Sequence, residues 1–239
     1  MTSLNGAVVL VTGANGGLGT EFVRQALERG ADHVYASARS PRDWDDSRVI
    51  PVPLDVTSDR SVAEVAESLA ADTTVVVNNA GILRPGSLLD GDLADVREQM
   101  ETNFFGPLRV TRAFAPALRA SSGAVINVAS VLSWLAFGNG YSASKAALWS
   151  ATDSLRLSFA TDDVQVVGAY LGYTDTAMTP GDMPKNDPAD VVRAIFDGLE
   201  SGAHEVLADT VTRAARAGLS LPVHERYALG TTTADSGEK

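Results

Sequence analysis

The sequence predicts a single α/β domain with a doubly wound parallel sheet of about seven strands flanked by helices. Short runs of apolar and β-branched residues alternate with helix-length amphipathic segments from the first residue to about Leu207. Several of these runs are apolar on both faces, as buried parallel strands are. No linker interrupts the alternation, so we expect one domain over residues 1–229. A disordered tail is expected at 230–239, where the sequence becomes small and polar.

The predicted elements follow one another in a regular order. The expected strands are 7–12, 33–37, 49–54, 74–78, 124–128, 164–169 and 205–208. The expected helices are 19–30, 61–70, 93–120 and 141–160, with Ser58 as an N-cap. The 93–120 helix is the longest, and its apolar residues at helical spacing are Leu93, Val96, Met100, Phe104 and Leu108. Connections of this length are right-handed crossovers, so helices should cover both faces of the sheet.

The composition excludes several classes of function. A formal net charge of −11 argues against nucleic acid and anionic membranes as partners, because both bind basic surfaces. The chain has no cysteine, which excludes disulfides, thiol catalysis and thiolate metal sites. Its three histidines are far apart, so no metal site is expected. No signal peptide or membrane-spanning run is recognisable, and we expect a cytoplasmic protein.

A glycine-rich turn, TGANGGLG at 12–19, follows the first strand and precedes the first helix. In such a turn, backbone N–H groups and the helix dipole bind a pyrophosphate, and side chains would block its approach. The turn opens a strand–helix–strand unit, which favours dinucleotide binding over the alternative of a plain tight turn. The residues predicted to bind the cofactor here are Gly13, Asn15, Gly17, Leu18 and Gly19.

The end of the second strand discriminates between the two nicotinamide cofactors. Many NAD sites place an acidic residue there to bind the ribose 2′-hydroxyl. This sequence has Ala38 and then Arg39. The missing carboxylate removes repulsion of a 2′-phosphate, and the arginine guanidinium matches phosphate geometry. The sequence therefore favours NADP over NAD, with a solvated surface arginine as the alternative.

Two more strand ends complete the predicted cofactor site, because ligands bind at the carboxyl ends of parallel strands. After the third strand, an aspartate can accept a hydrogen bond from the adenine amino group. After the fourth, the NNAG turn has asparagines that can fix its backbone and a glycine that lets a ribose approach. Turn chemistry alone is the alternative. The cofactor residues predicted at these two ends are Asp55, Val56, Asn79, Ala80 and Gly81.

Four motifs together resemble the short-chain dehydrogenase/reductase family. They are TGANGGLG, the NNAG turn, Asn103 within a long helix, and YSASK at 141–145. Their order and the chain length match the compact, single-domain branch of that family over nearly the whole chain. The resemblance implies a Rossmann-type fold and an NADPH-dependent reduction of a ketone or aldehyde, reversible as an alcohol dehydrogenase. It also implies a Ser–Tyr–Lys–Asn catalytic set.

The resemblance gives each catalytic residue a role. Tyr141 is the general acid/base, and because a free tyrosine has a pKa of about 10, a nearby ammonium should lower that pKa. Lys145, one helical turn away, would supply this charge and bind the nicotinamide ribose. Asn103 would hold a water that links the lysine to solvent, with an exposed helix asparagine as the alternative. Ser130 would bind the substrate oxygen beside the tyrosine.

The serine is the least regular part of the motif. Tyr141 follows Ser130 by eleven residues, which is shorter than the family commonly shows. We favour Ser130 over Ser133 because it lies at the mouth of the strand, where ligands bind. The shortening falls in WLAFGNG at 134–140, which should form a wall of the substrate pocket. A shorter wall either widens the pocket or moves Ser130 out of line.

The remaining predictions concern the substrate pocket. After the sixth strand, Thr176 matches the threonine that binds the nicotinamide carboxamide in relatives, although leucine replaces the usual proline at 171. No motif places an arginine to bind a carboxylate, so a small, neutral and apolar carbonyl substrate is expected. The side chains expected to line the pocket are Leu83, Trp134, Phe137, Tyr173, Met178 and Met183, with core packing as the alternative.

Two other functions stay open, and the assembly is a separate expectation. One is a non-catalytic NADP-binding sensor or scaffold. The other is a sugar-nucleotide epimerase or dehydratase, which shares Tyr-x-x-x-Lys but needs a larger C-terminal domain. The resemblance implies a homo-oligomer, a tetramer or a dimer, formed through helices 93–120 and 141–160. The aromatic residues that would lie either in that interface or in the core are Phe105, Phe114, Trp149 and Phe159.

Overall fold

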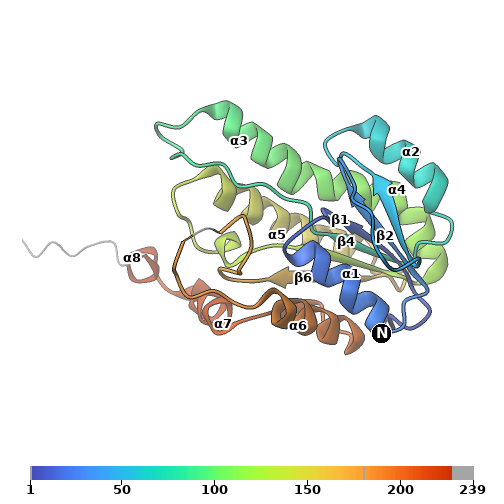
Figure 1. The fold of residues 1–239 in the computed structure, drawn as a ribbon. Helices are drawn as coiled ribbons and strands as arrows, with labels where there is room; N and C mark the ends of the chain where they lie inside the picture. Colours follow the sequence, from blue (N-terminus) through green and yellow to red (C-terminus); the bar gives the residue numbers. More distant parts are fainter. Residues whose placement is uncertain (1, 180, 228–239) are drawn as a thin grey trace, which may run out of the picture.

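The computed structural model describes residues 2–179 and 181–227, which form one parallel sheet between two layers of helices (Figure 1). The strand order is β3-β2-β1-β4-β5-β6-β7, and every neighbouring pair is parallel. The strands are β1 (Val8–Thr12), β2 (His33–Ala38), β3 (Val49–Pro53), β4 (Val75–Asn78), β5 (Ala124–Val128), β6 (Gln165–Tyr170) and β7 (Glu205–Leu207). The predicted fold class is confirmed, and each predicted strand overlaps an observed one. The predicted tail at 230–239 lies outside the described residues.

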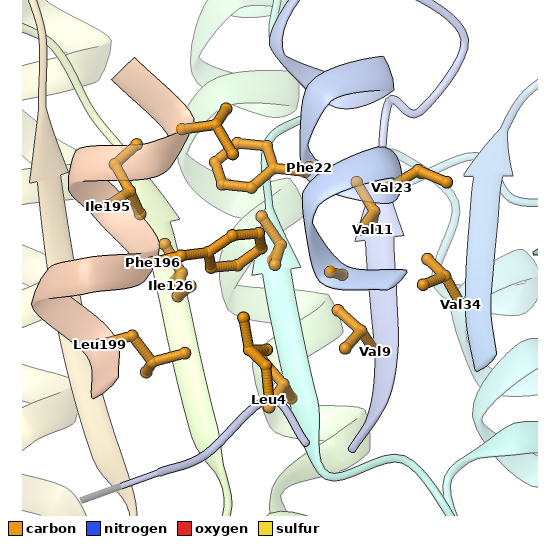
Figure 2. Packing of buried hydrophobic residues seen from close by; sticks show 14 of the residues in the cluster. Leu4, Val9, Val11, Phe22, Val23, Val34, Ile126, Ile195, Phe196 and Leu199 are labelled. Atoms are coloured by element: carbon orange, nitrogen blue, oxygen red, sulfur yellow. The ribbon is translucent and has the colours of Figure 1, made fainter. Parts of the chain in front are cut away.

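One face of the sheet is covered by α1 (Leu18–Glu28) and α6 (Pro188–Glu200). Figure 2 shows their meeting point, where the Phe22 and Phe196 rings pack edge to face with centroids 5.4 Å apart. Alternate strand residues such as Val9 and Ile126 lie beneath them. The sequence analysis had no helix at 188–200, although the buried residues of α6 follow a helical spacing. They are Val191, Val192, Ile195, Phe196 and Leu199.

The other face is covered by α2 (Asp59–Leu69), α4 (Gly106–Ser121) and α5 (Gly140–Ser158). Val110, Phe114 and Phe159 pack there on the strand residues that point away from α1. The predicted cap of α2 is confirmed, because the Ser58 hydroxyl accepts a hydrogen bond from the Ser61 N–H at 3.2 Å. Both faces of the central strands are therefore buried, which explains their uninterrupted apolar sequences.

The helix predicted as continuous over 93–120 consists of three segments. A π-helical turn, η1 (Glu101–Phe105), separates α3 (Leu93–Met100) from α4. The predicted apolar stripe is not the buried face: Leu93 is 57% exposed, whereas Gln99, Thr102 and Asn103 are buried. The wider turn shifts the register of the helix and directs these polar side chains inward. Turns of this type are frequent at functional sites.

The C-terminal part of the chain packs beside β6 and β7. It contains α7 (Thr210–Ala217), the 3-10 turn η3 (Gly218–Ser220) and α8 (Val223–Arg226), while a second 3-10 turn, η2 (Val131–Ser133), follows β5. Residues of α7 and η3 pack against Trp134, just after η2. Within the described ranges, no helix has the length and apolar character needed to cross a membrane.

Candidate active site

The carboxyl ends of the central strands open onto two adjoining cavities. The first has a volume of about 330 Å³ and the second about 660 Å³, and both are lined by Gly13, Ala80 and Gly81. Most of the predicted site residues line one of them. Those in the first cavity alone are Gly17, Leu18, Asn79, Ser130, Tyr141, Lys145 and Thr176. Those in the second alone are Asn15, Arg39, Asp55 and Val56. Gly19 and Asn103 line neither.

The glycine turn is shaped by the absence of side chains. Gly13 and Gly17 have positive φ angles of 67° and 54°, which residues with a Cβ rarely adopt. A Cβ would lie 2.9 Å from the Ala80 Cα at Gly13, and 3.0 Å from the Thr176 methyl group at Gly17. At Gly19 a Cβ would lie 2.1 Å from the Gly13 carbonyl oxygen. Gly19 therefore allows α1 to start against the turn, although it does not line the cavity.

The N-terminus of α1 suits an anion. Gly17 precedes the helix, and no side chain caps the first turn. Gly16, Gly17 and Leu18 at this helix start line the first cavity, and a pyrophosphate is the ligand that such an uncapped helix start favours. The turn thus fits a dinucleotide cofactor.

Asn79 and Thr12 lock the NNAG turn to the glycine turn. The Thr12 hydroxyl accepts hydrogen bonds from the Asn79 and Ala80 N–H groups, both at 3.0 Å. The Asn79 amide donates to the carbonyl oxygens of Thr12 at 2.9 Å and Gly13 at 3.1 Å. Asn78 is buried on the far side of the turn, where its amide donates to Asn127. Asn79 therefore fixes the backbone as the sequence predicts, whereas Asn78 instead bonds to Asn127 and Thr111.

The second cavity ends at the segment after β2. The Asn15 side chain donates to the Ser40 carbonyl at 2.7 Å and so ties the glycine turn to this segment. Arg39, the arginine predicted to bind a phosphate, is exposed at the cavity, and Arg97 also lines it. Asp55 accepts from the Thr57 N–H at 2.9 Å and from its hydroxyl at 2.7 Å, and these bonds lower the pKa of the Asp55 carboxyl.

Asn103 is completely buried in the π-helical turn, so the alternative of an exposed helix asparagine is wrong. Its amide oxygen accepts from the Ile82 N–H, and its amide nitrogen donates to the Ile82 carbonyl, both at 2.8 Å. The nitrogen also donates to Ser144 at 3.0 Å, and the Ser144 hydroxyl donates to the Tyr141 carbonyl. Asn103 therefore connects the end of the NNAG turn to the first turn of α5. The water relay predicted for it stays a prediction.

Lys145 and Tyr141 lie one turn apart at the start of α5. The Lys145 ammonium is buried, donates to the Val128 carbonyl at 2.8 Å and lies 5.6 Å from the centre of the Tyr141 ring. Burial lowers the pKa of Lys145 to about 8. Burial also raises the pKa of Tyr141 to about 12, although the neighbouring Ser130 hydroxyl opposes the increase. The shift at Tyr141 is thus opposite to the predicted one, because removal of the phenolate from water is the dominant effect.

Ser130 contacts Tyr141, and the short loop between them does not separate the two residues. The Ser130 hydroxyl also accepts from the Leu132 N–H at 3.1 Å and so caps η2. Ser133 is buried within η2 and lines neither cavity. Of the two serines considered, the structure brings Ser130 to the tyrosine.

The wall of the first cavity differs in part from the prediction. Leu83, Tyr173 and Met178 line it, together with residues that the sequence analysis missed, Val131, Leu132 and Ala177. These three residues lie next to the predicted Ser130 and Thr176 in the sequence. This proximity was the signal by which they could have been predicted.

Trp134, Phe137 and Met183 do not line this cavity, so their predicted place in the pocket wall is wrong. Trp134 is buried with its ring stacked on that of Tyr170, 4.3 Å between centroids. Phe137 is 61% exposed, and Met183 lies beside a separate shallow depression. The glycine-containing turn at 138–140 directs Phe137 outward, while the preceding tryptophan fills the core.

Among the described residues that line the first cavity, Lys145 is the only one with a charged side chain. Within the same described ranges there is no group of three or more histidine or carboxylate side chains that could hold a metal ion. The cavity therefore combines a hydroxyl pair and one ammonium with apolar walls.

Comparisons with known proteins agree with this site. A family profile described as "short chain dehydrogenase" matches residues 7–187. A short-chain dehydrogenase of Penicillium crustosum is 36% identical over 184 residues, which cover 70% of this chain and 66% of that protein. The NADPH-dependent 1-acyldihydroxyacetone phosphate reductase of Schizosaccharomyces pombe is 33% identical over 196 residues, covering 74% and 66%. The matched part is thus just under two thirds of these relatives.

Solved structures give a more complete match. A short chain dehydrogenase from Burkholderia cenocepacia, crystallised in complex with NADP, superimposes with a TM-score of 0.88 and is 38% identical. The match covers 95% of this chain and 97% of that one. A gluconate 5-dehydrogenase from Beutenbergia cavernae, described as putative and with bound NADP, gives a TM-score of 0.78 at 29% identity. That match covers 89% of this chain and 98% of the other.

Proposed function

This chain belongs to the short-chain dehydrogenase/reductase family, and on that premise we propose that it is an NADPH-dependent reductase of a neutral ketone or aldehyde. The reaction is reversible, so the same protein would oxidise the corresponding alcohol. The observation that carries the proposal is the meeting of Ser130, Tyr141 and Lys145 at the wall of the first cavity, beside the glycine turn. A sensor or scaffold without turnover would have no need of this hydroxyl pair and ammonium.

The residues of the two cavities fit NADP. Gly13 and Gly17 would hold the pyrophosphate at the start of α1, Asp55 would bind the adenine, and Arg39 would bind the 2′-phosphate. When bound, NADPH supplies the hydride for the carbonyl carbon. Two comparisons support this cofactor: the Burkholderia cenocepacia protein was crystallised with NADP, and the fission yeast relative is NADPH-dependent by name.

The chain's own residues supply the proton and orient the carbonyl. The Ser130 and Tyr141 side chains line the same cavity and would both donate to the substrate oxygen. With a pKa raised by burial, Tyr141 is protonated at neutral pH, as a general acid must be. When it gives up its proton, the Lys145 ammonium, still mostly charged at pH 7, would offset the phenolate charge.

The charge distribution favours a neutral substrate. The fission yeast relative acts, by its name, on a phosphorylated ketone. In this chain, the described lining of the first cavity has no arginine, and its single ammonium is bonded to Val128. A phosphate or carboxylate would therefore lose its hydration without a matching partner, which costs several kcal/mol. Leu83, Leu132 and Met178 offer apolar contacts instead.

We also propose that the protein is a homo-oligomer, a tetramer or a dimer, which associates through the segment 93–120 (α3, η1 and α4) and through α5. Phe114 and Phe159 are core residues, whereas Phe105 is 43% exposed and Leu157 on α5 is 80% exposed. Light scattering after gel filtration would test this: a monomer would contradict it.

The experiment for the proposed function is NADPH consumption with a panel of aryl and alkyl ketones, beside a Tyr141→Phe variant and an NADH series. Turnover with NADPH that disappears in the Phe variant is the expected result. If NADPH binds but no carbonyl in a broad panel reacts, the sensor or scaffold would be the better account.

A further inference from the structure

The loop between Ser130 and Tyr141 is held from a distant part of the chain. Tyr227 directly follows α8, more than ninety residues after the loop. Its hydroxyl donates to the Trp134 carbonyl at 3.2 Å and accepts from the Ala136 N–H at 3.0 Å. One side chain thus satisfies a backbone acceptor and a backbone donor two residues apart, at the middle of the loop.

The Trp134 side chain packs against β6, α5 and α7. Its ring stacks on Tyr170 of β6 and meets Trp149 of α5 edge to face, with centroids 6.1 Å apart. The Arg216 guanidinium of α7 lies 5.7 Å from the tryptophan ring. The ring therefore anchors the loop to β6, α5 and α7, and the Tyr227 hydroxyl fixes the backbone that carries this ring.

Hydrogen bonds from other segments also hold the loop on either side of Trp134 and Ala136. The Val131 N–H donates to the Leu171 carbonyl, and the Leu88 N–H donates to the Gly138 carbonyl, both at 2.8 Å. Between these two points the Tyr227 hydroxyl is the partner of Trp134 and Ala136. The C-terminal segment thus supplies a partner for one acceptor and one donor of the loop backbone.

We propose that Tyr227 is a positioning residue for the substrate site. Its hydroxyl keeps the loop in the conformation that places Ser130, Val131 and Leu132 at the wall of the first cavity, which Tyr141 also lines. Tyr227 itself does not line that cavity, so it acts through the loop. The inference rests on the proposed function, because its kinetic consequence is a change in ketone binding.

The test is Tyr227→Phe, which removes the hydroxyl and keeps the ring. We expect the KM for the ketone to rise about three- to tenfold, the range that follows from losing a neutral hydrogen-bond bridge. The KM for NADPH should not change, because the glycine turn does not contact the loop's middle. The matched control is Tyr35→Phe on β2. It removes a hydroxyl that donates a hydrogen bond to Asp72 at 3.0 Å. It should leave the ketone KM unchanged.

Hydrogen exchange gives a readout that needs no turnover. The Ala136 amide donates to the Tyr227 hydroxyl, so peptides covering 133–138 should exchange faster in Tyr227→Phe than in the wild type or in Tyr35→Phe. If the wild type reduces no ketone but exchange rises as expected, the proposed function fails and the role of Tyr227 in holding the loop stands. If the wild type reduces ketones and the Phe variant matches it in ketone KM, the positioning role is overturned, whatever the exchange shows. An equal rise in the KM for NADPH would also overturn it.

Discussion

The cofactor half and the substrate half of the cleft are held in different ways. In the cofactor half, backbone segments approach one another because Gly13, Gly17 and Gly19 have no side chains. In the substrate half, side chains from distant segments hold the loops, as Tyr227 does for the loop after β5. The first arrangement tolerates no added atom, whereas the second can be altered one contact at a time.

Asp209 is a second example of a distant support. This buried carboxylate accepts from the Gly172 N–H at 2.6 Å and from the Asn186 amide at 3.1 Å, and its other oxygen caps α7 through Thr212. It therefore holds both ends of the segment that carries Thr176 and the cavity wall. The substrate half thus depends on side chains from the C-terminal part of the chain.

The largest expected effect separates chemistry from cofactor binding. Tyr141→Phe should lower kcat/KM for ketone reduction by about 10²- to 10⁴-fold, the usual contribution of a general acid. NADPH affinity should be retained, because the ring remains and the glycine turn is untouched. Steady-state kinetics and a fluorescence titration with NADPH would measure the two quantities. Equal losses in both would mean that the two halves are not separable.

A single added methyl group at Gly19 should lower both the stability of the protein and its affinity for NADPH. In Gly19→Ala the new Cβ meets the Gly13 carbonyl oxygen at 2.1 Å, so the backbone must shift. We expect the free energy of unfolding to fall by about 1–3 kcal/mol, as in overpacked cores, and NADPH affinity to fall with it. Gly16→Ala is the control for stability, because a Cβ there meets nothing within 4 Å. Denaturant unfolding of both variants would measure the difference, and equal stabilities would contradict the argument.

Arg39 should affect the preference for NADPH over NADH and leave the other properties of the enzyme unchanged. Arg39→Ala removes one charge-assisted contact to the 2′-phosphate, so the KM for NADPH should rise about 10- to 100-fold. The KM for NADH, which has no 2′-phosphate, should stay the same. Arg42→Ala is the matched control, since the Arg42 guanidinium stacks on the Trp44 ring, 3.9 Å from its centroid. A loss of NADPH affinity in the Arg42 variant instead would assign the phosphate to that residue.

The smallest expected effect is a pH dependence that belongs to Lys145. Burial places its pKa at about 8, so the ammonium is present below that pH and is lost as the pH rises through it. Tyr141, with a pKa of about 12, stays protonated over the same range. The kcat/KM for NADPH, which reports the free enzyme, should therefore be constant below about pH 8 and decline above it. A flat profile up to pH 10 would contradict this assignment.

Prediction from the sequence succeeded where a local pattern carries the physical cause. The buried strands are recognisable because both of their faces are apolar, and the glycine turn because glycine alone permits its φ angles. It failed at α3, where the apolar spacing around Leu93 indicated a buried face. The π-helical turn at 101–105 follows α3, and within it Asn103, placed by its contacts with Ile82 and Ser144, is buried.

The sequence by itself determined the fold class and the position of the glycine turn, because these follow from the periodicity of apolar residues and from the small size of glycine. Only the tertiary structure decided that Trp134 packs in the core, that Ser130 reaches Tyr141 across a short loop, and that Tyr227 and Asp209 support the substrate half. Contacts between residues so far apart in the chain leave no local signature, since they depend on how the completed sheet and its helices bring the segments together.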